Sequence, residues 1–369
     1  MSSKAAKNTR LITFAVLAVS FVMYGQSITG PLIANIIADA PQYDPTLISM
    51  IQTYPCLGVI ISSIAYGALS RRFSNRTLLI AATVLYVIGG VAPAFLGSNI
   101  PAILAFRVVL GLGIYCTIPV ALIAENFEGN TGAAVNGWVQ VSASIGSVVF
   151  QTAAGYIALL DWHMANYLSL LSIVACIVAL LLLPKTPKDP SNTALLQKAA
   201  AEERAARKSM AFSEKYPPIV IAYFVEIFLF VGGIAILMMN ASIVIDTKGF
   251  GTPVEAGYAL SIHTICGIIA GFIFGLVFKA CKEYVLAIAA ACALVSSPVC
   301  GFATNLGMVY AGAGILGFAA PWTCASLYQL IGKYSAPVAS AMAVSIATAL
   351  QFGAQFLLGY WLAPLCTAL

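Results

Sequence analysis

Charged side chains are scarce in this sequence. Asp, Glu, Lys and Arg make up only 8% of the 369 residues, whereas 61% of the residues are hydrophobic. Ordinary soluble domains contain roughly 25% charged residues. The 18 basic and 13 acidic side chains are too few to cover so much apolar sequence in water, so lipid must be the outer solvent. The composition therefore excludes a water-soluble fold.

Motifs of enzymes and metal-binding proteins are also lacking. The nine cysteines include no CxxC pair, and we expect them to lie inside helices as small apolar residues. The sequence has no phosphate-binding loop, no His/Glu metal spacing and no nucleophile elbow. The net charge of +5 follows the loops and forms no single basic patch. We therefore expect no enzymatic activity, no metal, no cofactor and no nucleic-acid partner.

Long apolar runs fill most of the chain, and turn-forming residues separate them. A transmembrane helix needs about 20 such residues. The runs predict an all-α polytopic membrane protein with spans at 11–36, 46–69, 77–97, 100–123, 133–158, 164–184, 217–245, 254–278, 283–302, 304–330 and 336–361. The first run follows Lys4, Lys7 and Arg10, as a secretory signal would. At about 25 residues it exceeds the roughly 7–15 of a signal, so we interpret it as a span.

One long polar segment, with seven basic residues, separates two apolar blocks. It divides the chain into an N-terminal six-helix bundle (1–184), a linker (185–216) and a C-terminal bundle (217–369), and residues 193–210 are predicted to form a helix near the headgroups. With a cytoplasmic N-terminus, 16 of the 18 basic residues lie on the cytoplasmic side and only Lys248 lies outside. This distribution predicts a multi-pass protein of the cell (inner) membrane, with its N-terminus in the cytoplasm.

The two blocks repeat each other. Residues 45–67 can be aligned with residues 253–275, and the end of the fifth span, QTAAGY, with the end of the eleventh, QFLLGY. Three local patterns add to this repeat: GALSRRFSNR at 67–76, RVVLGLG at 107–113 and DWHMANY at 161–167. With them, the chain resembles the major facilitator superfamily (MFS).

The resemblance implies the MFS fold, in which two pseudo-symmetric helical bundles enclose a cavity lined by helices 1, 4, 7 and 10. It also implies a conformational gate motif at Gly67, Arg71, Arg72 and Arg76. The sequence departs from the family at three points: Arg71 replaces the usual Asp, Phe150-Gln151 replaces the Gly-Pro of drug–proton antiporters, and a twelfth helix is missing after the 6 + 5 spans.

Ionisable residues inside the spans are costly and commonly functional. Arg107 offers a planar guanidinium suited to a carboxylate or phosphate, or it is a structural arginine satisfied by neighbouring helices. Glu226, near mid-depth of the seventh span, could carry a proton or only hold helices together. His263 could relay protons or be a packed core residue.

Uncharged candidates follow from the resemblance and from polar stripes. Helices 1, 4, 7 and 10 supply candidate substrate contacts at Tyr24, Gln26, Tyr115, Asn240 and Trp322, each of which could instead serve packing. Gln151 and Gln355 lie on polar stripes of the fifth and eleventh spans, where amides bind a solute or join helices.

These features favour a secondary active transporter. It would move a small organic solute, with an organic anion favoured, across the membrane by alternating access, as a monomer in the lipid bilayer. Coupling to a proton or exchange against a counter-substrate would drive it. The alternatives are a drug/proton efflux antiporter and, in another class, a non-transporting membrane sensor or scaffold.

Overall fold

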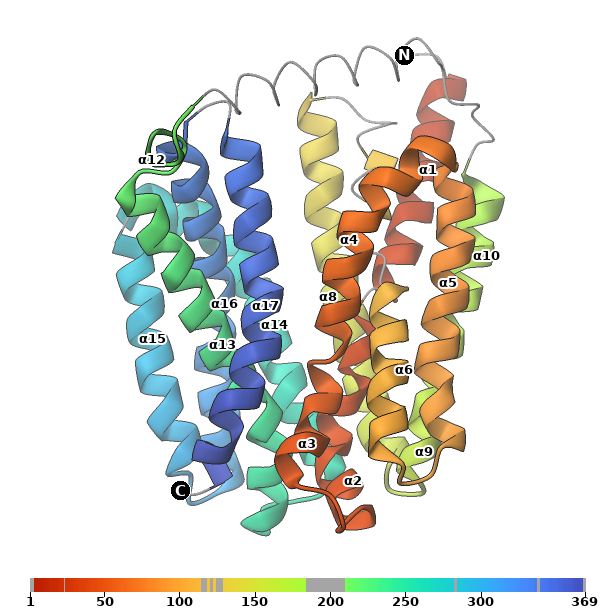
Figure 1. The fold of residues 1–369 in the computed structure, drawn as a ribbon, viewed down its shortest axis with the longest axis vertical. Helices are drawn as coiled ribbons and strands as arrows, with labels where there is room; N and C mark the ends of the chain where they lie inside the picture. Colours follow the sequence, from red (N-terminus) through yellow and green to blue (C-terminus); the bar gives the residue numbers. More distant parts are fainter. Residues whose placement is uncertain are drawn as a thin grey trace.

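A computed structural model of the chain describes residues 3–22, 24–113, 118–119, 122–123, 129–183, 210–281, 284–336 and 339–367. Throughout these residues the regular structure is helical, and the long helices run roughly parallel to one axis (Figure 1). Eight helical stretches are long and apolar enough to cross a membrane, and two shorter apolar helices accompany them. Each predicted span contains a helix; the predicted linker helix at 193–210 lies almost wholly outside the described residues.

The N-terminal half contains the first six spans. The first comprises α1 (Ser3–Phe21), η1 (Gly25–Leu32) and α2 (Ile33–Asp39), and the second α3 (Pro45–Ser49), η2 (Met50–Gln52) and α4 (Pro55–Arg72). The next are α5 (Asn75–Val91) with η3 (Ala92–Phe95), α6 (Ile100–Leu112) and α8 (Gly129–Ile157). The sixth comprises α9 (Trp162–Ala165), η4 (Asn166–Leu170) and α10 (Leu171–Leu182).

The C-terminal half consists of longer, unbroken helices. After the short α12 (Phe212–Lys215) come α13 (Pro218–Thr247), α14 (Pro253–Cys281), α15 (Tyr284–Gly301), α16 (Leu306–Tyr334) and α17 (Ser340–Thr367). The loops between spans start helices through polar N-cap residues. Asn99 accepts from the backbone N–H of Ala102 at 3.3 Å, and Asn305 from that of Met308 at 3.0 Å. These caps satisfy N–H groups that have no partner within the helix.

The apolar run of the first span predicted a single transmembrane helix, but the structure shows that this helix is interrupted. Residues 25–32 form a 3₁₀ helix that contains Pro31. Proline has no N–H to donate and disturbs the preceding turn, and a 3₁₀ stretch within a helix often marks a functional position. The break brings a short polar segment, Gln26 and Ser27, into the middle of the N-terminal half.

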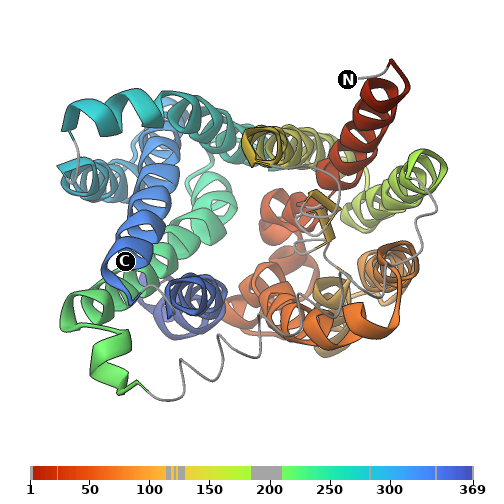
Figure 2. The same cartoon turned by 90° about the horizontal axis from the view of Figure 1, so that it is seen from above.

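The two halves lie side by side and meet most extensively between α8 and α14 and between α4 and α17 (Figure 2), and α13 also contacts η1 and α2. The contacts gather away from the face where α1 begins. Ser242 donates a hydrogen bond to the carbonyl of Pro31 at 3.1 Å, the hydroxyls of Thr152 and Ser261 lie 3.0 Å apart, and Tyr156 and Tyr258 share a hydrogen bond. We call the α8–α14 contact, residues 148–156 with 253–261, the seam.

Candidate functional site

Arg107 of α6 lies inside the N-terminal half. Its side chain is only 2% exposed. Nη2 donates to Oδ1 of Asn166 at 3.0 Å, while Nε has no hydrogen-bond partner in the part of the chain that the structure describes. Among the described residues, no carboxylate lies within 4.0 Å of the guanidinium. The positive charge of Arg107 is therefore buried without an anionic partner among these residues. Such a charge is costly to bury unless it is paired.

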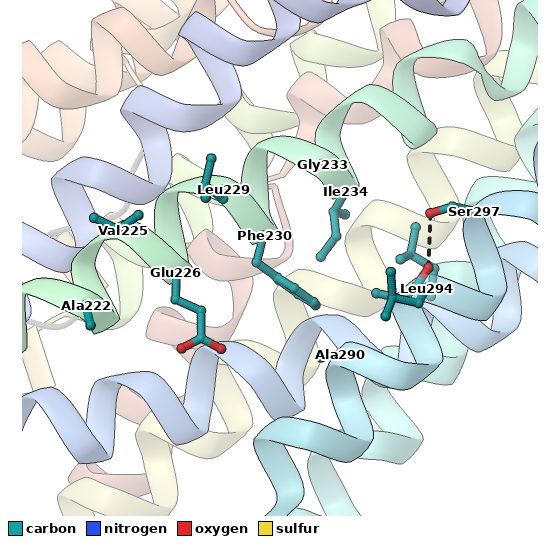
Figure 3. Close-up of a pocket in the computed structure, with 12 residues that line it drawn as sticks. Ala222, Val225, Glu226, Leu229, Phe230, Gly233, Ile234, Ala290, Leu294 and Ser297 are labelled. Carbon is teal, nitrogen blue, oxygen red and sulfur yellow. Dashed lines mark hydrogen bonds between the residues drawn. The ribbon is translucent and has the colours of Figure 1, made fainter. Parts of the chain in front are cut away.

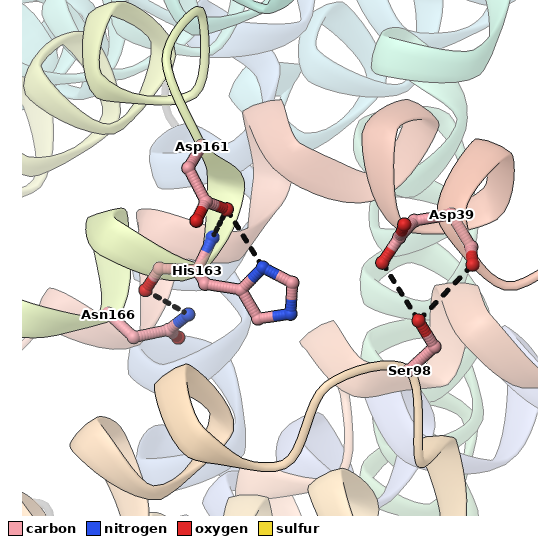
Figure 4. A network of polar contacts seen from close by, with 5 residues as sticks. All are labelled: Asp39, Ser98, Asp161, His163 and Asn166. Carbon is pink, nitrogen blue, oxygen red and sulfur yellow. Dashed lines mark hydrogen bonds and ion pairs between the residues drawn. The ribbon is translucent and has the colours of Figure 1, made fainter.

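Asn166, at the start of η4, orients this guanidinium. Its Nδ2 donates to the carbonyl of His163 at 3.1 Å, which leaves Oδ1 to accept from Arg107. Figure 4 shows the surrounding network at the same end of the molecule. Asp161 caps α9 by accepting from the backbone N–H of His163 at 2.8 Å, and the imidazole Nδ1 lies 2.8 Å from the same oxygen. These hydrogen bonds hold the pKa of Asp161 below its usual value, and the bond from the backbone N–H of His163 has the largest effect.

Further polar groups of the N-terminal half lie on η1, α5 and α8. The hydroxyl of Tyr86 lies against Gly25, where a Cβ atom would stand only 2.0 Å from it. On α8, Gln151 donates a hydrogen bond to the hydroxyl of Ser147 at 3.1 Å. Ser147 in turn donates to the hydroxyl of Ser27 on η1 at 3.2 Å. Oε1 of Gln151 is buried and has no hydrogen-bond partner among the described residues. We call Arg107, Tyr86, Ser27, Ser147 and Gln151 the polar cluster; it joins η1, α5, α6 and α8.

The other predicted substrate contacts lie in different surroundings. Trp322 is buried and donates its indole N–H to the carbonyl of Ala270 at 2.9 Å, which joins α16 to α14. Gln355 accepts from the thiol of Cys56 at 3.2 Å and so joins α17 to α4. Gln26 is part-buried with its Oε1 unpartnered, while Tyr24 and Asn240 are half-buried. Tyr115 lies outside the described residues.

Glu226 does not lie with Arg107. Its carboxylate points into a groove between α13 and α15 that is backed by α16 (Figure 3). It stands eight residues after Pro218, about 12 Å along α13 and thus within the first third of this 30-residue helix. His263 lies elsewhere, where α14 crosses α16. A Cβ at Gly317 would stand 2.3 Å from the His263 carbonyl, and the buried Nε2 of His263 has no partner within the described ranges.

The residues of the predicted gate motif lie at the face where α1 begins. Arg76 donates to the carbonyl of Leu183 at 3.1 Å and to that of Leu180, so it caps the end of α10. Arg72 is exposed, and the side chains at 67 and 71 lie outside the described set. Arg76 thus ties the third span to the sixth.

Sequence reasoning missed Asn166 and Tyr86. Asn166 was visible as the sixth residue of the DWHMANY pattern, but its contact with Arg107 joins residues 59 apart in the chain. Tyr86 gave no signal, since one tyrosine in an apolar run also fits simple packing. Only the close approach of Gly25 reveals its place.

The chain is similar to known membrane transporters in sequence pattern and in fold. A family model described as Major Facilitator Superfamily matches residues 15–359. No curated protein matches. Solved structures share the fold: a D-xylose–proton symporter (TM-score 0.70, 20% identity, covering 95% of this chain and 88% of that one) and the nucleoside transporter NupG (0.70, 14%, 96% and 89%). The xylose transporter XylE from E. coli, in an inward open conformation, is also similar (0.69, 17%, 97% and 89%).

Proposed function

This chain belongs to the major facilitator superfamily, and we propose that it is a secondary active transporter that moves a small organic anion across the cell membrane. The two halves would move against each other and so alternate access to the anion site, while the lipid bilayer surrounds them. The basic residues of the loops favour a cytoplasmic N-terminus.

The observation that carries the choice of an anion is the buried charge of Arg107, which has no anionic partner among the described residues. The guanidinium is buried, the side chain that it contacts among the described residues is the neutral amide of Asn166, and its Nε has no partner among them. A carboxylate or phosphate would supply the missing charge through the planar fork of the guanidinium. The amide and hydroxyl groups of Gln151, Ser147 and Ser27 would complete the contacts around the anion.

Closure of the seam supports alternating access. At Gly155 a Cβ would stand 2.7 Å from the carbonyl of Pro253, and at Gly257 2.9 Å from that of Gln151. The backbones of α8 and α14 therefore touch across the two halves. Glycines let helices approach so closely and separate again. With a cytoplasmic N-terminus, this arrangement is closed on the outside, and the anion would enter or leave from the cytoplasm.

Coupling to a proton, or exchange against a counter-substrate, completes the proposal. Glu226 and His263 are the candidates for the proton, because each is ionisable and each lies within a span. Uptake into proteoliposomes under an imposed pH gradient tests them. If Glu226→Gln retains proton-driven accumulation, Glu226 is not the coupling residue, and the same comparison with His263→Gln decides on the histidine.

The anion itself is tested by thermal stability, since a ligand that binds the folded state raises the melting temperature. We expect carboxylates or organic phosphates to stabilise the wild type but not Arg107→Gln. Arg72→Gln, which removes an exposed arginine, is the matched control and should respond like the wild type. Stabilisation by sugars or cationic drugs alone would refute the choice of an anion.

A further inference from the structure

Three glutamine amides lie around η1. Gln26 belongs to η1 itself, Gln52 ends η2 and Gln151 lies in α8. The Oε1 atom of each is buried and has no hydrogen-bond partner among the described residues. Buried polar atoms in proteins are almost always hydrogen-bonded. Three such oxygens in one region therefore indicate a partner that the described chain does not itself supply.

These amides gather where the first span is interrupted. η1 packs against both η2 and α8. A Cβ at Gly30, within η1, would stand 3.5 Å from Nε2 of Gln52. Ser27 of η1 accepts from Ser147, and Gln151 donates to the same Ser147 hydroxyl. The three glutamines therefore border one short segment, although they come from three different spans.

Arg107 lies beside the same segment, and Tyr86 connects the two. The Tyr86 hydroxyl lies against Gly25 of η1, and Tyr86 interacts electrostatically with the guanidinium of Arg107. Asn166, which accepts a hydrogen bond from Arg107, begins η4, and η4 also contacts η1. The proposed anion site and the three amides therefore belong to one region of the N-terminal half.

The charge of this region limits the charge of its ligand. Arg107 is the only basic residue within a predicted span, and no described carboxylate lies within 4.0 Å of its guanidinium. One carboxylate balances this single charge. A phosphate monoester carries about −1.5 to −2 charges near pH 7, and an ammonium group would add a second cation. Each would leave a buried charge without a partner, which is costly.

The amides select the uncharged part of the ligand. An amide oxygen can only accept, whereas a hydroxyl both donates and accepts and so bonds an amide in either orientation. An alkyl chain would leave the amides unpaired in a buried place, and buried polar groups without partners weaken binding. A site with several such amides therefore discriminates strongly against a ligand that lacks hydroxyl groups.

We propose that the site takes a hydroxylated monocarboxylate, whose carboxylate binds Arg107 while its hydroxyl groups bind the three glutamine amides. The inference rests on the proposed function and narrows its anion, because aliphatic carboxylates, dicarboxylates and organic phosphates are poorer ligands. It also adds Gln52, on the second span, to the groups that contact the solute.

Calorimetric titration of the purified full chain tests this choice with ligands matched in carbon number. Glycerate is compared with propanoate, and gluconate with hexanoate; glucarate and phosphogluconate add a second acidic group. In the pair that binds more tightly, we expect the hydroxylated acid to have a Kd at least about tenfold lower than its aliphatic counterpart. Glucarate and phosphogluconate should bind more weakly than gluconate.

Substitution of single glutamines by methionine keeps the side-chain length and removes the amide. Gln52→Met should weaken binding of the hydroxylated acid and leave that of the aliphatic acid unchanged, and Gln26→Met should act in the same way. Without ligand, neither variant should melt at a lower temperature than the wild type, because no hydrogen bond to the protein is lost. Gln140→Met, which removes an exposed glutamine of α8, is the matched control and should bind like the wild type.

Each contrary result has a distinct meaning. Equal binding within both pairs would overturn this inference and leave the anion site standing. Tighter binding of glucarate or phosphogluconate than of gluconate would overturn the single negative charge. A lower melting temperature of both ligand-free methionine variants would show that the amides join helices instead of binding a solute. If none of these anions binds, the proposed anion site itself fails, and this inference fails with it.

Discussion

Replacing Gly155 by alanine should force the seam open. The added Cβ would stand 2.7 Å from the carbonyl oxygen of Pro253 and 3.1 Å from the Cα of Val254. Both neighbours are backbone atoms, so no side chain can rotate away to make room. Relief requires α8 and α14 to separate by several tenths of an ångström, and overpacking of this kind costs about 1–3 kcal/mol.

This cost falls on the closed arrangement alone, because the two helices belong to different halves. A state in which the seam has separated would not contain the clash. A difference of about 1–3 kcal/mol between two states changes their ratio by roughly 5- to 150-fold. We therefore expect Gly155→Ala to shift the population toward the arrangement that is open on the outside.

The assay follows the accessibility of a cysteine at the seam. Thr152→Cys replaces a hydroxyl that lies 3.0 Å from that of Ser261, in a background in which the native cysteines are replaced. A membrane-impermeant maleimide added outside should label this cysteine at least about fivefold faster when Gly155→Ala is also present. Gly257→Ala, on the opposite helix, should act in the same direction.

The control is Gly137→Ala on the same helix. A Cβ at Gly137 meets nothing within 4 Å, while the gain in helix propensity from glycine to alanine is the same. Labelling in this variant should match the parent protein. If Gly155→Ala labels as slowly as Gly137→Ala, then the α8–α14 contact is not a closing surface, and alternating access at this seam is refuted.

Three further outcomes follow from other contacts. Asn166→Asp places a carboxylate against Arg107, so carboxylate ligands should no longer raise the melting temperature; retained stabilisation would contradict the anion site. Asp161→Asn should lower the melting temperature near pH 7, where ionised Asp161 accepts from His163. Because the folded-state pKa of Asp161 is depressed, this contribution is present above the ordinary value of 3.8 and is lost as pH falls through the folded-state value, so the two melting curves should converge in acid. Arg76→Gln removes a charged donor from two carbonyls of the sixth span; we expect a loss of about 1.5–3 kcal/mol, and an unchanged melting temperature would show that the cap is not needed.

The spans were predictable because lipid imposes a simple rule. Backbone groups in hydrocarbon must bond within the helix, so each apolar run of sufficient length had to be a helix. Asn99 and Asn305 begin helices for a different reason, since their side-chain oxygens accept from N–H groups that the first turn leaves without a partner. The 3₁₀ break at 25–32 was not predictable from hydrophobicity, since Pro31 occurs within an apolar run and prolines are tolerated in membrane helices.

The surroundings of the ionisable residues could not be predicted. Arg107 could be recognised as a buried charge, but its partner Asn166 depends on how the fourth span packs against the start of the sixth. The rotation of α13 was equally hidden, because a helix that is apolar all round shows no polar face that would indicate which side meets protein. The sequence placed Glu226 within the seventh span, yet it could not show that this carboxylate faces a groove.

The two halves differ in a way that the sequence repeat does not suggest. In the N-terminal half the first span is interrupted at η1. There Ser27 accepts a hydrogen bond from Ser147, and Gly25 lies beside the hydroxyl of Tyr86. Its counterpart α13 runs for 30 residues without a break. A broken helix exposes polar groups that an unbroken one keeps within itself, so recognition should be concentrated in the N-terminal half while the C-terminal half moves against it as a rigid body. Substitutions in the polar cluster should then change affinity for the anion, whereas substitutions along α14 at the seam should change the rate of opening.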